Sequence, residues 1–162
     1  MLFLDDCLYS QYAFLKEYAD KLKKRGIVCI LGFSTKIHRN EGAPMQYAVC
    51  AECHDKFHTG DMSVLNAYMT VDEIKELLAN DNVYIACHGA RHLKLEDVTP
   101  AHLQMKMFEA DLQEAVDDLS SFGLHTNIFV FPYAYSDILY AYAILKQKGF
   151  YCIFAGKGTL RI

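Results

Sequence analysis

The chain has 162 residues, of which 52% are hydrophobic and 22% are charged. This length and composition fit one globular domain with a single core, and they exclude a disordered protein. The net charge of −4 argues against nucleic acid as a partner, and no apolar run reaches the ~20 residues of a membrane span.

Apolar runs typical of buried strands alternate along the chain with segments of helical periodicity. The runs are continuous rather than alternating, which indicates parallel strands covered by helices. The predicted strands are 1–4, 27–32, 83–87, 127–131 and 151–155. The predicted helices are 11–24, 70–78, 99–121 and one that begins at Ser136 or Asp137 and ends at 149. The sequence therefore predicts an α/β fold in a single domain over residues 1–162.

Residues 35–69 follow neither periodicity. A loop of this length inside a compact domain usually has a function or forms a small excursion of its own. A sheet that ends at the fifth strand leaves an open edge, and such edges are usually paired, which favours a homo-oligomer.

The first residues contain two acids, Asp5 and Asp6, before any basic segment or long apolar segment, so they do not form a signal peptide. We therefore expect a cytoplasmic protein. Its six cysteines are then reduced rather than paired in disulfides.

Polar residues follow three of the predicted strands. Asp5-Asp6 follows the first, His88 and His92 of "CHGARH" follow the third, and Pro132-Tyr133 follows the fourth. Because the carboxyl ends of parallel strands meet at one edge of a sheet, we expect these residues to form a shared site.

Two histidines four residues apart and one carboxylate make a three-ligand metal site with open coordination positions, as in catalytic centres. The adjacent carboxylate could act as a base toward a coordinated water. Each element also has a simpler interpretation: solvent-facing histidines at a turn, an aspartate that caps a helix, and a proline that ends a strand.

Together the segments "LFLDDCLYS", "HGARHLKL" and "FVFPYAYS" resemble, in order, the motifs of the polysaccharide deacetylases (NodB homology, carbohydrate esterase family 4). The resemblance implies a distorted, incomplete (β/α) barrel. It implies that Asp5 is the general base and that Asp6, His88 and His92 bind a divalent metal. The metal is usually Zn²⁺, with Co²⁺, Ni²⁺ and Mn²⁺ as alternatives.

The implied reaction is hydrolysis of an N-acetyl or O-acetyl group on a carbohydrate, in which water on the metal attacks the acetyl carbonyl. The main-chain N–H of Tyr133 would help to hold the oxyanion. Pro132 and the Tyr133 ring would line the substrate pocket.

The sequence departs from the family pattern in three ways. Val130 stands where many members have an arginine that orients the base, and Gly89 stands where serine or threonine is common. The family's general-acid histidine near the end of the domain has no counterpart here, and His38, after the second strand, is the substitute that we consider. The departures leave two alternatives open: a catalytically impaired metal-binding or sugar-binding relative, and a hydrolase of another small C–N amide.

The segment "CAECHDKFH" in the long loop forms a second cluster of ligand residues. Cys50, Cys53, His54 and His58 could hold a structural zinc ion. Unliganded thiols are the simpler interpretation. The pattern also matches c-type haem attachment, which nothing else in the sequence supports.

Overall fold

The computed structural model describes residues 1–48, 50–95, 98, 100–134, 139–155 and 158–161. The chain forms two compact units, one of residues 1–33 and 37–85 and one of residues 34–36 and 86–162. The strands pair in sequence order, β1-β2-β3-β4-β5-β6.

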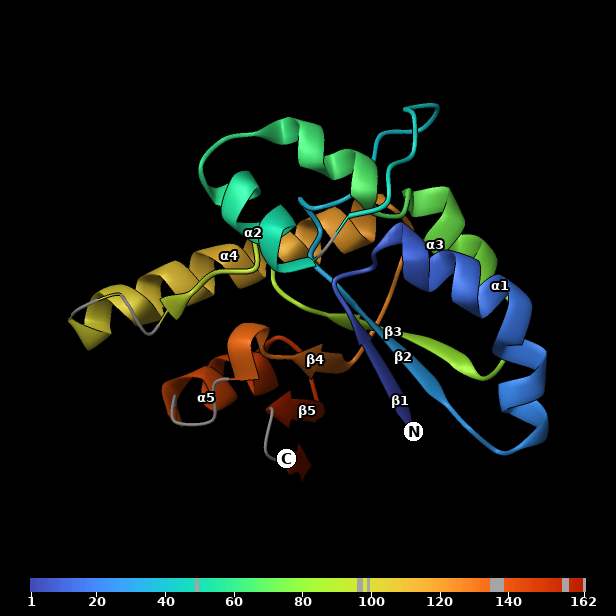
Figure 1. Ribbon diagram of the computed structural model, residues 1–162. Coiled ribbons are helices and arrows are strands. Elements are labelled where there is room, and N and C mark those ends of the chain that lie inside the picture. Colours follow the sequence, from blue (N-terminus) through green and yellow to red (C-terminus); the bar gives the residue numbers. More distant parts are fainter. Residues whose placement is uncertain (49, 96–97, 99, 135–138, 156–157, 162) are drawn as a thin grey trace. The chain divides into compact units, whose positions relative to one another are not determined.

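The first unit contains two parallel strands and the beginning of a third, with their connecting helices. Strands β1 and β2 pair from Leu2 opposite Cys29 to Asp5 opposite Gly32. Helices α1 and α3 lie side by side (Figure 1). The elements are β1 (Leu2–Asp5), α1 (Tyr9–Lys24), β2 (Cys29–Phe33), α2 (Cys50–His58), the 3-10 helix η1 (Met62–Ala67), α3 (Val71–Leu78) and the start of β3 (Val83–Cys87).

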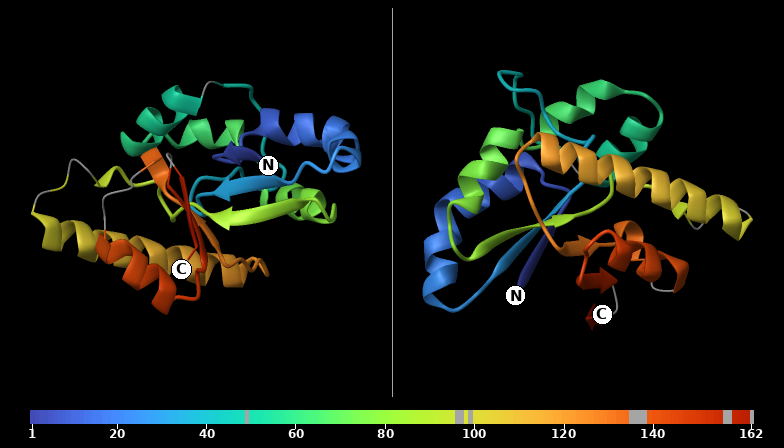
Figure 2. Two further views of the ribbon diagram at one scale, coloured as in Figure 1. Left: turned by 90° about the horizontal axis from the view of Figure 1, so that it is seen from below. Right: turned by 180° about the vertical axis from the view of Figure 1, so that it is seen from behind.

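The second unit contains the end of β3 and three further strands. Cys87 of β3 pairs in parallel with Phe129 of β4, β4 pairs in parallel with β5, and β5 pairs antiparallel with β6. Helices α4 and α5 lie side by side (Figure 2). The elements are α4 (Ala101–Ser121), β4 (Ile128–Val130), the 3-10 helix η3 (Pro132–Ala134), α5 (Leu139–Gln147), β5 (Cys152–Ala155) and β6 (Gly158–Arg161).

The predicted strands and helices are all present, and their described ends lie within two residues of the predicted ones. Helix α3 begins with a capping box: Thr70 Oγ1 accepts from the Glu73 N–H at 3.1 Å, and Glu73 Oε2 accepts from the Thr70 N–H at 2.8 Å. Ser136 and Asp137, the predicted caps of α5, lie outside the described residues.

Strand β6 was not predicted. It is a four-residue strand with no apolar alternation, and its strand character comes from antiparallel pairing with β5. The edge of β5 that the sequence left open is therefore paired within the chain, and a homo-oligomer stays a prediction.

The long segment 35–69 contains regular structure, namely α2 and η1. It packs with Leu8 in an apolar cluster of its own. The cluster consists of Leu8, Ile37, Cys53, Val64, Ala67 and Tyr68, with Phe57 and Leu65 against it.

Candidate functional site

The first predicted motif lies where β1 ends. Asp5 is the last residue of the strand and is exposed, while Asp6 is buried with 8% of its surface accessible. The Asp5 carbonyl oxygen accepts a hydrogen bond from Gln11 Nε2 at 2.6 Å, which ties the start of α1 to the motif. The two carboxylates are therefore in different environments, one open to water and one enclosed by protein.

Cys7 follows the two aspartates but is a poor ligand. Its thiol donates to the Gly32 carbonyl oxygen at 3.4 Å. Burial, and then the negative charges of Asp6 and Asp5, raise the pKa of the Cys7 thiol well above its ordinary value. Metals bind the thiolate, so this segment offers carboxylates as its donors.

His54 of α2 lies against Asp6. Its Nε2 is 3.2 Å from Asp6 Oδ1, and the two side chains are only 8% and 10% exposed. The pair offers an imidazole nitrogen and a carboxylate oxygen to one ion. The sequence predicted His54 as a donor in the long loop but did not predict its contact with Asp6.

The long segment is fastened to the rest of the first unit near both ends. Buried Arg39 donates to the Tyr68 carbonyl oxygen at 3.2 Å and to Glu73 Oε1 of α3 at 2.6 Å. The Met69 N–H donates to the Cys7 carbonyl oxygen at 2.8 Å. These contacts fold the segment back onto the residues that follow β1.

Helix α2 then positions His54. Cys53 is buried in the apolar cluster, and the next residue on a helix projects about 100° away around the axis. Anchoring Cys53 in the cluster therefore fixes the direction of the His54 ring, which stacks on Tyr68 with the ring centroids 6.4 Å apart.

The second motif begins as β3 ends. Nδ1 of buried His88 lies 2.8 Å from the Val130 carbonyl oxygen. A carbonyl can only accept, so Nδ1 carries a proton, and in the neutral ring Nε2 then carries the lone pair that a metal would use. The backbone of Val130 thus orients the His88 ring.

His92 completes the pair from the same loop. It is buried, and its ring centroid is 4.8 Å from that of His88. The Tyr133 ring of the third motif packs edge to face with the His92 ring, with the ring centroids 4.6 Å apart and the ring planes at 64°. Tyr133 itself is 41% exposed and follows buried Pro132. The second and third motifs therefore meet within the second unit, and the site shared by all three motifs stays a prediction.

Hydrogen bonds from the segment after β2 hold the loop at His88. Three successive carbonyl oxygens, those of residues 88–90, accept hydrogen bonds from residues 34–36. The donors are Ser34 Oγ to His88 O at 3.0 Å, Thr35 N to Gly89 O at 3.1 Å and Lys36 N to Ala90 O at 2.8 Å. This side of the loop is satisfied and has little freedom to move.

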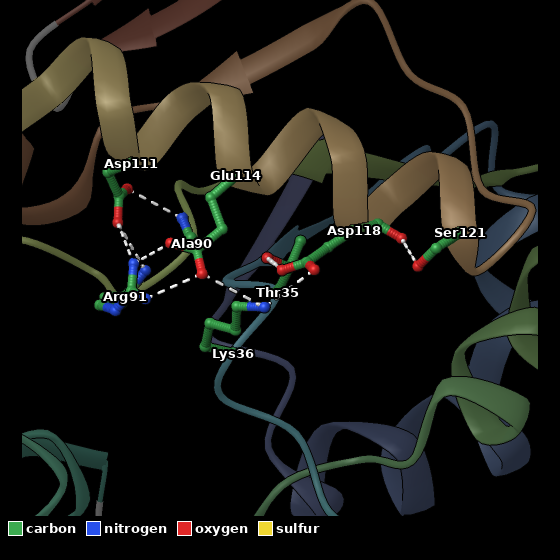
Figure 3. A network of polar contacts seen from close by, with 8 residues as sticks. All are labelled: Thr35, Lys36, Ala90, Arg91, Asp111, Glu114, Asp118 and Ser121. Atoms are coloured by element: carbon green, nitrogen blue, oxygen red, sulfur yellow. Dashed lines mark hydrogen bonds and ion pairs between the residues drawn. The ribbon is translucent and has the colours of Figure 1, made fainter.

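Asp111 of α4 holds the other side of the loop (Figure 3). Its carboxylate accepts from the Ala90 N–H at 2.8 Å and the Arg91 N–H at 3.0 Å. Burial raises the pKa of Asp111, while these two N–H groups act in the opposite direction. Gly89 leaves room for this carboxylate, because a Cβ there would lie 2.6 Å from Asp111 Oδ2.

Two further acids on the same face of α4 extend this network (Figure 3). Glu114 binds the Arg91 guanidinium with both oxygens, and Lys36 lies 3.3 Å from Glu114 Oε1 and 2.9 Å from Asp118 Oδ1. Thr35 Oγ1 donates to Asp118 Oδ2 at 2.7 Å. The spacing of these acids along one face of α4 is the sequence signal for this network, although a helical row of acids more often faces solvent.

Backbone strain is concentrated at the predicted motifs. Among the described residues, four that are not glycine have positive φ: Asp6 (+79°), Cys7 (+52°), His92 (+53°) and Tyr133 (+56°). This conformation costs roughly 1–2 kcal/mol per residue and persists mainly where function or surrounding structure requires it. All three predicted motifs contain such a residue.

The remaining predicted residues are His38 and the other candidate ligands of the loop zinc site. His38 is partly buried beside Phe33, with ring centroids 6.1 Å apart. His58 is exposed, and the Cys50 side chain lies outside the described part of the chain. Among the described side chains, Cys53, His54 and His58 do not form a three-ligand group. The loop zinc site stays a prediction.

No protein-family model matches the sequence, and neither does any curated protein. Solved structures do match. A de-N-acetylase from Aggregatibacter actinomycetemcomitans gives a TM-score of 0.67 at 18% identity, over 98% of this chain and 63% of that one. IcaB from Ammonifex degensii gives a TM-score of 0.65 at 19% identity, over 96% of this chain and 58% of that one. The polysaccharide deacetylase BC0361 from Bacillus cereus gives a TM-score of 0.58 at 14% identity, over 99% of this chain and 41% of that one.

The chain has the polysaccharide deacetylase fold. This confirms the predicted fold class, an incomplete (β/α) barrel with parallel strands. The chain spans less than two thirds of the length of each of these deacetylases. None of the helices in the described ranges is long and apolar enough to cross a membrane.

The motif resemblance implies a divalent metal, and the donors in each unit fit one. In the first unit, Asp6 and His54 present a carboxylate oxygen and an imidazole nitrogen 3.2 Å apart. In the second unit, His88 is held in the tautomer that leaves Nε2 able to bind, with the His92 ring beside it. Nitrogen and oxygen donors of this kind suit Zn²⁺, Co²⁺ and Ni²⁺.

Proposed function

We propose that this protein is a metal-dependent hydrolase that removes an acetyl group from an N-acetylated or O-acetylated carbohydrate. The observation that carries the proposal is the left-handed conformation of Asp6, His92 and Tyr133, one residue in each motif. Strained backbone at three segments far apart in sequence is typical of functional sites. The deacetylase fold supports the same reaction.

Asp6, His88 and His92 would hold the divalent cation, and their donor atoms suit Zn²⁺. Such a cation lowers the pKa of water and polarises an acyl oxygen. The buried Asp6 carboxylate and the oriented His88 ring are suited to binding, since neither has to reorganise from a solvent-exposed conformation.

Asp5 would act as the general base. Its exposed carboxylate at the end of β1 is accessible to water, and the hydrogen bond from Gln11 to its carbonyl oxygen fixes its backbone. It would accept the proton of the attacking water.

The third motif would bind the acyl group and the sugar. The Tyr133 N–H would donate to the oxyanion, in the left-handed turn that follows Pro132. The Tyr133 ring, partly exposed beside His92, presents a flat apolar surface of the kind on which a sugar ring stacks.

The experiment is acetate release from N-acetylated sugar oligomers, measured together with metal content. The wild-type protein should contain metal and release acetate. Asp5→Ala should keep the metal and lose 10²–10⁴-fold in rate, roughly the contribution of a general base. His88→Ala should lose the metal. His125→Ala, at an exposed position outside the motifs, is the matched control and should behave as wild type.

Metal held through His88 without acetate release would favour an impaired relative or an amide substrate of another kind. Unchanged metal content in His88→Ala and Asp6→Ala would contradict the proposed site.

A further inference from the structure

We infer that His54 is an additional protein ligand of the cation that Asp6 binds, an inference that rests on the proposed function. The long segment 35–69 would then contribute directly to the metal site. Within the first unit, His54 Nε2 and Asp6 Oδ1 are 3.2 Å apart and both side chains are almost completely buried.

The separation fits two donors on one ion. With metal–donor bonds of about 2.0–2.1 Å and angles of about 90–110°, as in a site that keeps a position open for water, neighbouring ligand atoms lie about 2.8–3.4 Å apart. The 3.2 Å between the His54 nitrogen and the Asp6 oxygen lies in that range. It also lies at the long end of the roughly 2.7–3.2 Å range of N–H···O hydrogen bonds.

Packing within the first unit holds His54 in its position. Cys53 anchors α2 in the apolar cluster, and Arg39 ties the segment to α3 through Glu73. The His54 ring also stacks on Tyr68, whose surface is fully buried. A ligand held in this way loses little conformational entropy when it binds a metal.

His54 changes the donor chemistry of the proposed site. Asp6, His88 and His92 supply one carboxylate and two imidazoles, and His54 adds a third imidazole. Imidazole-rich sites favour Zn²⁺, Co²⁺ and Ni²⁺ over Mn²⁺ and Mg²⁺, which prefer oxygen donors. The protein should therefore bind Co²⁺ much more tightly than Mn²⁺.

The test is Co²⁺ binding to the full chain, measured by titration and by the visible absorption of the bound ion. His54→Ala should weaken Co²⁺ binding at least tenfold, roughly as loss of a metal-site residue does, and should change the spectrum. His54→Gln keeps an amide N–H that can donate to Asp6 but lacks the imidazole, and it should show the same loss. His125→Ala, which removes an exposed histidine outside the motifs and outside the long segment, is the control and should bind as wild type.

Wild-type affinity and spectrum in His54→Ala would overturn the inference, and so would recovery in His54→Gln, which would make His54 a partner that only orients Asp6. Circular dichroism checks the fold, and if His54→Ala is unfolded, His54→Gln decides. Loss of Co²⁺ in His88→Ala with full binding in both His54 variants would leave the proposed function standing and reject His54 alone. Absence of Co²⁺ binding in the wild type would reject both.

Discussion

Replacing Gly89 by alanine should destabilise the protein through Asp111. Gly89 has φ of +79°, and an added Cβ would lie 2.6 Å from Asp111 Oδ2, well inside van der Waals contact. The carboxylate would have to move, and it is the acceptor for the Ala90 and Arg91 N–H groups. The substitution therefore strains the backbone and weakens the hydrogen bonds that hold the loop.

The two effects can be given magnitudes. Placing a residue with a Cβ in the left-handed region costs about 1–2 kcal/mol. Leaving one buried N–H without its acceptor costs about 1–3 kcal/mol. The sum, about 2–5 kcal/mol, is a large part of the roughly 5–15 kcal/mol by which domains are stable.

Gly123 offers a matched control. Its φ is +70°, but nothing lies within 4 Å of a Cβ built there. Gly123→Ala should therefore cost only the backbone strain. The assay is urea unfolding followed by circular dichroism, which gives the free energy of unfolding for each variant.

A double-mutant cycle tests the contact itself. In an Asp111→Ala background, the cost of Gly89→Ala should fall to that of Gly123→Ala, because the carboxylate that the Cβ meets is gone. Additivity within about 0.5 kcal/mol would refute the reasoning, since it is expected only of residues that do not interact. Equal costs for Gly89→Ala and Gly123→Ala in the wild-type background would refute it as well.

Three other predictions concern the same fold. The hydrogen bond from Arg91 lowers the pKa of Glu114 below its ordinary 4.5, so the stability it adds is full above that pH and is lost as pH falls through the lowered value. The stability difference between wild type and Glu114→Gln, a few tenths of a kcal/mol for a partly exposed pair, should therefore shrink in urea titrations from pH 6 to pH 3. Thr70→Ala removes the oxygen that caps α3 at Glu73 and should lower the free energy of unfolding by about 1 kcal/mol, whereas Thr70→Ser should keep most of it. Burial raises the pKa of the Cys87 thiol to about 12, so iodoacetamide at pH 8 should label Cys87 only in urea, and rapid labelling of the native protein would contradict its burial.

The sequence by itself determined the order of the elements and the positions of the three motifs. Continuous apolar runs are a local property, and so are the helical periodicity around them and the capping box at Thr70. Because polar residues that follow parallel strands gather at one edge, the sequence also predicted one site shared by the three motifs. The His92 and Tyr133 rings of the second and third motifs do lie together, and the whole site stays a prediction.

Only the tertiary structure decided what surrounds the motifs. The contact between His54 and Asp6 depends on how segment 35–69 folds back onto Cys7, through hydrogen bonds and packing between residues far apart in sequence. The hydrogen bond from the Ala90 N–H to Asp111 joins residues 21 positions apart in the sequence, and it needs the space that Gly89 leaves for the carboxylate. Periodicity shows which face of an element is buried, but the partners of that face are fixed only when the whole chain packs.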